Sequence, residues 1–147
     1  MSDKFFIDTN ILIYALDQHS PQKQVQAREL LRAANSQEKL ALSTQVLQEF
    51  FVASTRKLYL EPMTAKQILR GFSHFETVLI TTSLIEQAID DSIQYTLSFW
   101  DALIVTAADH IHCSELWTED LNDGQKVRGV TIVNPFEHFQ DVMAKFS

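Results

Sequence analysis

The sequence predicts an α/β fold in which a central, mostly parallel sheet of about five short strands is flanked by helices. Short, dense apolar runs alternate with longer segments whose apolar residues follow helical spacing, a pattern typical of a parallel sheet covered by helices. The length of 147 residues and the hydrophobic fraction of 46% fit one globular domain spanning residues 1–147. The sequence contains only three Gly and three Pro, which leaves little room for long irregular linkers.

The first half of the chain contains two predicted strands and three predicted helices. The apolar runs at 4–7 and 40–43 are of the kind found in buried parallel strands. Ser20 can serve as an N-cap and Pro21 as a proline at the first helical position. Thr44 is placed to cap the helix that follows the second strand. The helices expected here span residues 10–16, 20–34 and the segment that begins at 44.

The second half contains three more predicted strands and four more predicted helices. Thr64 and Gln67 have the spacing of a capping box, and Asn134 followed by Pro135 is a typical helix start. The segment that begins at Ser98 is apolar almost all round, which predicts a centrally buried helix. The elements expected here are strands at 77–81, 115–118 and 130–133, and helices at 64–75, 84–96, 98–109 and from 134 onward.

Charge and composition limit the class of protein. Nineteen acidic against twelve basic residues give a net charge of −7, which argues against coating of nucleic acid by bulk electrostatics. No apolar run approaches the roughly 20 residues of a membrane-spanning helix, and the N-terminal residues do not resemble a signal peptide. One cysteine, Cys113, cannot form an internal disulfide. We therefore expect a cytoplasmic protein that does not associate with membranes.

Four acidic residues each lie where an apolar run ends or a helix begins: Asp8, Glu49, Asp101 and Asp120. Asp8 and Asp120 follow predicted strands, and Glu49 lies one helical turn beyond the predicted strand at 40–43. The topology therefore predicts that these three acids share one edge of the sheet. A carboxylate between large apolar residues is costly to bury without a partner, and none of the four has a basic neighbour in its own segment. If they converge, a divalent cation is the simplest compensation.

Each of these acids also has an ordinary explanation when it is taken alone. Asp8 can form a turn after a strand, and Glu49 can be a solvated helix residue. Asp101 lies three residues after Ser98, the spacing of a capping box. Asp120 can be a loop acid beside Glu119. The joint pattern of the four favours a functional site.

A divalent metal site explains the joint pattern physically. Two carboxylates about 4 Å apart repel each other by roughly 4 kcal/mol at an effective dielectric near 20. Mg²⁺ and Mn²⁺ prefer oxygen ligands, and Mg²⁺ usually takes one or two carboxylates directly and keeps several waters. Such an ion activates a bound water against a phosphate, which predicts phosphodiester hydrolysis. Asn10 and Thr118 lie beside the acids and are predicted to orient them or the water.

Other candidate sites are weaker. The spacing of His110 and His112 is not standard for zinc, so surface histidines are predicted. Cys113 lacks a cysteine partner and a triad-like context, which favours a buried structural thiol. No glycine-rich phosphate loop is present in the sequence. The remaining basic residues are scattered and are expected on a solvated surface; they include Arg28, Arg32, Arg56, Lys57, Lys126 and Arg128.

The chain resembles the PIN-domain family, specifically the VapC-type toxin ribonucleases of bacterial toxin–antitoxin pairs. The segments that carry the resemblance are residues 6–12, 48–50, 100–104 and 116–124, followed by 130–136. They occur in order, with family-like separations, and extend over the whole chain. The resemblance implies that Asp8, Glu49, Asp101 and Asp120 bind Mg²⁺ or Mn²⁺ and carry catalysis. It places Asn10 and Thr118 at supporting polar positions, and Asp123 of the same segment is grouped with them.

By this resemblance, the expected activity is endonucleolytic cleavage of RNA, silenced by a cognate antitoxin protein. The resemblance also implies a homodimer, and we expect apolar residues of the N-terminal half to be exposed at interfaces: Ile13, Tyr14, Leu16, Leu58, Tyr59 and Leu60. The acidic cleft predicts that Arg or Lys of the antitoxin can pair with the site acids in competition with metal.

Two alternatives belong to other classes. A phosphatase of the haloacid-dehalogenase type would use Asp8 as its nucleophile, but position 10 holds Asn where that pattern needs a second Asp, and no downstream Lys motif is evident. A catalytically silent binding module is the other alternative, and the presence of all four acids counts against it.

Overall fold

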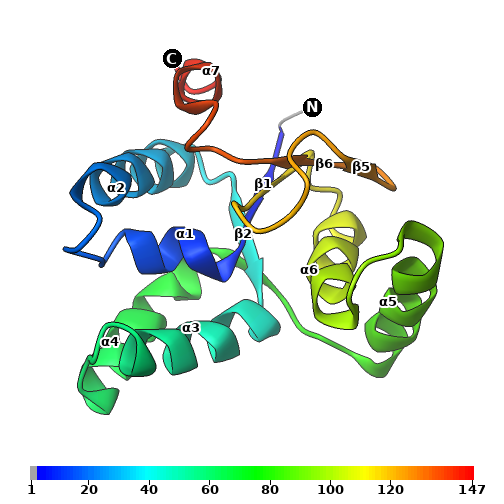
Figure 1. Ribbon diagram of the computed structural model, residues 1–147, viewed down its shortest axis with the longest axis horizontal. Coiled ribbons are helices and arrows are strands. Elements are labelled where there is room, and N and C mark those ends of the chain that lie inside the picture. The colour runs from blue at the N-terminus through cyan, green and yellow to red at the C-terminus, as the bar shows by residue number, and fades with distance from the viewer. Residues whose placement is uncertain (1–2) are drawn as a thin grey trace.

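In the computed structural model, which describes residues 3–147, helices lie on both sides of a six-stranded sheet (Figure 1). The strand order is β3-β2-β1-β4-β6-β5. Neighbouring strands are parallel except for the last pair. The strands are β1 (Phe5–Ile7), β2 (Leu40–Ser43), β3 (Glu76–Val78), β4 (Glu115–Trp117), β5 (Lys126–Val127) and β6 (Val130–Val133). The predicted fold class is therefore confirmed.

Two groups of helices cover the sheet. In Figure 1, α1 to α4 and α7 lie to the left of β1 and β2, while α5 and α6 lie to their right, below β5 and β6. The predicted central helix is confirmed as α6, in which every residue from Ala102 to Ala108 is buried. The helices are α1 (Thr9–Tyr14), α2 (Pro21–Ser36), α3 (Thr44–Arg56), α4 (Pro62–Gly71), α5 (Thr82–Tyr95), α6 (Phe99–His110) and α7 (Phe139–Ala144).

The register brings the ends of the central strands together. Phe5 is paired with Glu115 and Ile7 with Trp117, so β1 and β4 end side by side. The residue after β1 continues this pairing, because the Asp8 amide donates to the Trp117 carbonyl at 3.1 Å. All three residues of both strands are buried, which anchors this edge of the sheet in the core.

Several predicted boundaries were wrong because a neighbouring residue makes the capping contact. Ser43, rather than Thr44, caps α3 by accepting from the Val46 amide. The Thr44 hydroxyl instead accepts from the Ile80 amide, next to β3. Glu61 caps α4 from outside the predicted capping box, by accepting from the Thr64 amide.

The C-terminal region differs most from the sequence prediction. Asn134 does not start a helix: its side-chain oxygen accepts from the Phe136 amide, which forms a local turn, and α7 begins five residues later at Phe139. β5 was not predicted from the sequence; it has only two residues and pairs antiparallel to β6. The strand predicted at 77–81 is shorter, and it ends at Val78.

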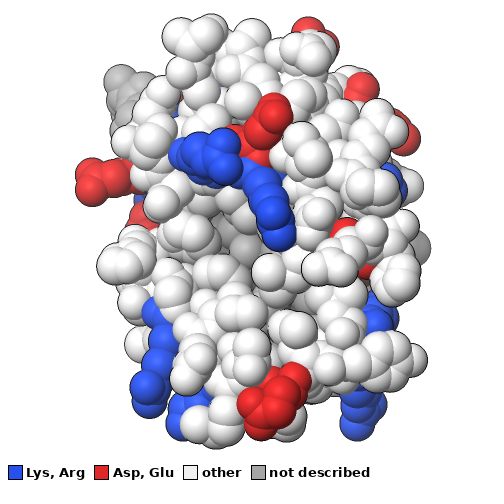
Figure 2. Space-filling view, turned by 90° about the vertical axis from the view of Figure 1, so that its left-hand side faces the viewer, with Lys and Arg blue, Asp and Glu red and all other residues white. Residues whose placement is uncertain are grey.

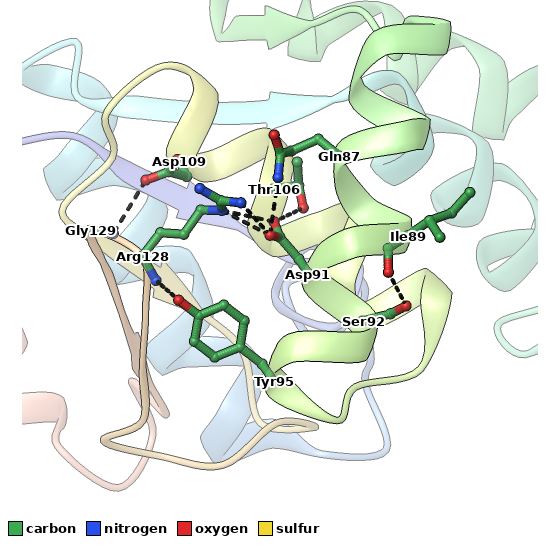
Figure 3. Close-up of polar contacts among 9 residues, drawn as sticks. All are labelled: Gln87, Ile89, Asp91, Ser92, Tyr95, Thr106, Asp109, Arg128 and Gly129. Atoms are coloured by element: carbon green, nitrogen blue, oxygen red, sulfur yellow. Dashed lines mark hydrogen bonds and ion pairs between the residues drawn. The ribbon is translucent and has the colours of Figure 1, made fainter.

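An ion pair with a buried carboxylate connects α5 to the turn between β5 and β6 (Figure 3). The Asp91 carboxylate is fully buried and accepts from two guanidinium nitrogens of Arg128, at 2.9 and 2.6 Å. The Thr106 hydroxyl of α6 donates to it at 2.7 Å. Burial raises the pKa of Asp91, but the bonds from Arg128 and Thr106 outweigh this and lower it below its usual value. One carboxylate thus joins α5, α6 and the β5–β6 turn.

The apolar surface differs from the prediction. Of the six apolar residues expected to be exposed, only Tyr59 is exposed, with 85% of its area accessible. The other five are half-buried. Three of them, Ile13, Tyr14 and Leu16, pack against the core. The largest exposed apolar fractions apart from Tyr59 belong to residues on other elements, among them Trp100, Ile93 and Leu79. No described helix is long and apolar enough to cross a membrane.

Cys113 is buried, as predicted, and burial raises the pKa of its thiol to about 12. His110 and His112 are exposed, which confirms the prediction of surface histidines.

Candidate active site

The four acids predicted from the sequence line one cavity of about 510 Å³. Asp8 follows β1 and caps α1, because its carboxylate accepts from the Thr9 amide. Glu49 lies in α3, Asp101 in the first turn of α6, and Asp120 in the segment after β4. The carboxyl ends of two central strands and two helices from opposite sides of the sheet therefore meet at this cavity.

The Thr118 hydroxyl connects three of the polar groups on the strand side of the cavity. It donates to the Asp8 carboxylate at 2.9 Å and accepts from the Asn10 side-chain amide and the Asp120 backbone amide, both at 3.1 Å. The Asn10 amide also donates to the Asp120 carboxylate at 2.9 Å. Thr118 is fully buried, so this arrangement is fixed before any ligand binds.

A second set of bonds fixes the helix side. The Thr9 hydroxyl donates to Glu49 at 3.0 Å, and the Gln45 side-chain amide donates to the other Glu49 oxygen at 3.3 Å. The same Gln45 amide donates to the Trp100 carbonyl at 3.2 Å, directly before Asp101. Gln45 therefore links α3 to the start of α6. Thr9 and Gln45 were not predicted from the sequence, although Gln45 lies four residues before Glu49, on the same helix face.

The cavity has the features expected of a cation site. The side-chain oxygens of Asn10 and Gln45 are buried and have no hydrogen-bond partner among the described residues. Burial raises the pKa of Asp8 to about 6; hydrogen bonds from Thr9 and Thr118 oppose this shift, and the charges of Glu49 and Asp120 add to it. A bound Mg²⁺ or Mn²⁺ would pair with the free oxygen acceptors and would favour the charged form of Asp8. The site therefore fits such a cation.

The four acids line the cavity, but their carboxylate oxygens do not all come together at one position. In the described part of the chain, no three of these four carboxylates have oxygens that all lie within 4.8 Å of one another. This spacing suits an ion that keeps some of its waters and binds one or two carboxylates directly.

Asp123, grouped with the supporting residues, does not line the cavity. Its carboxylate accepts from the Asn134 amide at 2.8 Å and contacts the His138 ring at 2.6 Å. It lies in an exposed group with Glu137 and His138, where it fixes the segment before α7.

A polar network at the cavity was also not predicted from the sequence. Glu119 accepts from the Tyr14 hydroxyl at 2.5 Å and from the Lys23 ammonium at 2.7 Å. The Lys23 ammonium lies 4.7 Å from the centre of the Tyr14 ring. Glu119 and Tyr14 both line the cavity. This network holds the residue next to Asp120 in place, and no local sequence pattern predicts it because Glu119 lies 105 residues from Tyr14 and 96 residues from Lys23 along the chain.

The basic side chains do not form a continuous patch on the face that Figure 2 shows. They stand in small groups at the upper centre and along the lower part, with a broad uncharged area between them. Lys57 is the one Lys or Arg among the cavity-lining residues of the described chain. This distribution agrees with the net charge of −7.

Comparisons with known proteins agree with this geometry. The family model described as PIN domain matches residues 5–127. A toxin–antitoxin complex from Klebsiella pneumoniae contains a chain with 25% identity and a TM-score of 0.63, covering 88% of this chain and 96% of that chain. DNA-bound VapBC from Salmonella typhimurium gives 20% identity and a TM-score of 0.63, with 89% and 97% covered.

A third solved structure shares the fold. Mycobacterium tuberculosis VapC20, described as a sarcin-ricin loop cleaving toxin, gives 19% identity and a TM-score of 0.64, with 80% of this chain and 92% of that chain covered. No curated protein sequence matches the chain significantly.

Proposed function

Because the chain belongs to the PIN-domain family, we propose that it is a metal-dependent endoribonuclease that acts as the toxin of a toxin–antitoxin pair. The observation that carries this proposal is the meeting of Asp8, Glu49, Asp101 and Asp120 around one cavity. The structural likeness to a toxin–antitoxin complex from Klebsiella pneumoniae supports the toxin assignment. The buried Cys113 thiol fits action in the reducing cytoplasm.

In this proposal the four acids hold Mg²⁺ or Mn²⁺, with one or two of them as direct ligands and the others acting through water. The ion, when bound, activates a water and stabilises the negative charge that develops on the phosphate. Thr118 keeps Asp8 and Asp120 at the fixed separation that its hydrogen bonds set, and Asn10 orients Asp120. Gln45 donates hydrogen bonds to Glu49 and to the Trp100 carbonyl, and so fixes Glu49 relative to the start of α6.

The two alternatives have less support. A haloacid-dehalogenase-type phosphatase needs a second acid two residues after Asp8, whereas the amide nitrogen of Asn10 donates to Thr118 and Asp120. A silent binding module has no need of four carboxylates around one cavity, where they repel one another.

Metal dependence provides the test of this function. We expect the purified protein to cleave RNA in Mg²⁺ or Mn²⁺ and to be inactive in excess EDTA, with activity restored by adding back the metal. Sequencing the 5′ ends of RNA after brief expression would identify the cleaved sites. Equal cleavage in EDTA and in Mg²⁺ would contradict the metal mechanism, and a complete lack of cleavage in all conditions would contradict the nuclease assignment.

We also propose that the protein forms a homodimer and binds an antitoxin. Exposed apolar side chains on two helices support an interface: Phe51 and Val52 on α3, and Ile89 and Ile93 on α5. The acidic cavity favours an antitoxin segment that presents Arg or Lys, which would compete with metal for the carboxylates. Sedimentation velocity at micromolar concentration should show a dimer, and a monomer there would refute this part of the proposal.

A further inference from the structure

Trp100 is the most exposed large aromatic residue of the candidate site. Its side chain lines the same cavity as the four acids, immediately precedes Asp101, and keeps 63% of its area exposed. The other tryptophan, Trp117, is completely buried in β4. A large indole left in solvent beside a set of converging carboxylates suggests a surface that a ligand covers.

The backbone that carries this indole is fixed on several sides. Ser98 caps α6 by accepting from the Asp101 amide at 3.1 Å. The Gln45 amide donates to the Trp100 carbonyl, and the Phe99 ring packs edge-on against the Trp100 ring with centroids 5.1 Å apart. The indole is therefore presented from a rigid helix start, on the residue directly before Asp101 of the site.

The charge distribution limits how a nucleic acid can be held here. Lys57 lines the cavity, but the Lys23 ammonium is committed to Glu119 at 2.7 Å, and the net charge of the chain is −7. Attraction of the phosphate backbone is therefore weak compared with that of a basic nucleic-acid-binding protein. Stacking of a base on an aromatic ring does not depend on charge, so it can supply binding that the electrostatics do not.

We propose that Trp100 is a stacking platform for an unpaired nucleobase next to the scissile phosphate. The inference rests on the proposed nuclease function. A base inside a duplex has both faces covered by its neighbours, so it cannot present one to the indole without being extruded. Apolar Ala53, Leu58 and Ile104 line the same cavity and leave it suited to a base as well as to a phosphate.

The two tryptophans allow a direct measurement of this contact. In EDTA, where RNA is not cut, the emission of Trp100 should be quenched when a single-stranded RNA oligonucleotide containing a cleaved site is added. The same sequence annealed to its complement should cause little quenching. A Trp100→Leu protein keeps only the buried Trp117 and should show no response to either RNA.

Affinity and cleavage provide the second measurement. Trp100→Leu should weaken single-stranded RNA binding roughly five- to hundredfold, whereas Trp100→Phe, which retains a ring, should lose much less. With Mn²⁺ added, the loss should raise KM more than it lowers kcat. Because Trp100 is exposed, both variants should melt at the parent temperature.

The outcomes separate this inference from the nuclease proposal. One outcome is that the parent cuts RNA while the Leu and Phe variants have equal RNA affinity and equal cleavage rates. In that case the stacking role is wrong and the nuclease assignment stands. Equal quenching by duplex RNA would also overturn it. If Trp100 is instead covered by a protein partner, the Leu variant will lose only partner binding, which likewise contradicts the proposal.

Discussion

Replacing Asp8 with Asn is expected to abolish metal-dependent RNA cleavage while leaving the metal-free protein at least as stable as the parent. The loss should exceed about a hundredfold, because changing residues that merely support a metal ligand already costs 10–100-fold in affinity or activity. Stability should not fall, because burial and the nearby charges of Glu49 and Asp120 make the charged Asp8 carboxylate unfavourable in the folded protein. The neutral Asn side chain avoids this unfavourable free energy.

The pH dependence of stability tests the same residue without any substrate. Burial raises the pKa of Asp8 from 3.8 to about 6, so the folded state binds this proton more tightly than the unfolded state does. Its contribution to the free energy of unfolding is fully present below about pH 4 and is lost as the pH rises through about 6. The shift corresponds to roughly 3 kcal/mol if fully expressed, and we expect about 1–2 kcal/mol because the side chain is only half-buried.

Thermal or urea unfolding between pH 4 and pH 7 in EDTA would measure this effect. The parent should lose stability relative to Asp8→Asn across that range, and added Mn²⁺ should stabilise the parent but not the variant. Asp90→Asn is the matched control, because Asp90 is an exposed carboxylate on α5 and does not line the cavity. A variant that melts below the parent at pH 7 without metal would assign Asp8 a structural role instead.

Replacing Arg128 with Ala is expected to cause the largest loss of stability among single changes outside the core. It leaves the Asp91 carboxylate buried and without its cationic partner, which typically costs 3–5 kcal/mol. We expect a value near the lower end, about 3 kcal/mol, because 34% of the Arg128 side chain is exposed and water can replace part of it. The melting temperature should fall by about 10 °C.

The backbone at this position helps to isolate the ion pair. Arg128 has a φ of 51°, in the left-handed region, and Ala is strained there in the same way, so the Ala variant changes mainly the side chain. Arg128→Lys should give an intermediate loss, because an ammonium cannot reproduce the two guanidinium bonds. The double change Asp91→Leu with Arg128→Met should recover part of the stability. Equal stability of the parent and the Ala variant would show that the pair contributes nothing.

Three of the four acids could be predicted to share one edge because their positions are set by local rules, and Asp101 joined them through the joint pattern and the family resemblance. Asp8 and Asp120 follow strands, and parallel strands present their carboxyl ends at one edge. Asp101 lies three residues after a helix-capping serine, which places it in the first turn of α6. Apolar runs and caps are visible in any single sequence, and here they placed three of the acids that line the cavity; Asp101 was added by the joint acidic pattern and by the resemblance to a known family.

The residues that hold these acids could not be predicted in the same way. The bond from Thr9 to Glu49 and the pairing of Glu119 with Lys23 join segments 40 and 96 residues apart. Their existence depends on how α1, α2 and α3 pack, which no local pattern encodes. The strand β5 was missed for a related reason: two residues are too few to show a period, and only pairing with β6 defines them as a strand.

The pairing of β1 with β4 has a consequence for protein synthesis. Asp8 leaves the ribosome early, but its hydrogen-bond partner Thr118 and the fourth acid Asp120 are made about 110 residues later. At roughly 5–20 residues per second, several seconds separate the first acid from the last. A nascent or prematurely released chain that ends before residue 115 lacks β4, the strand that pairs with β1, as well as Asp120. The proposed nuclease is therefore expected to be inactive until the segment with Thr118 and Asp120 has been translated and has paired with β1.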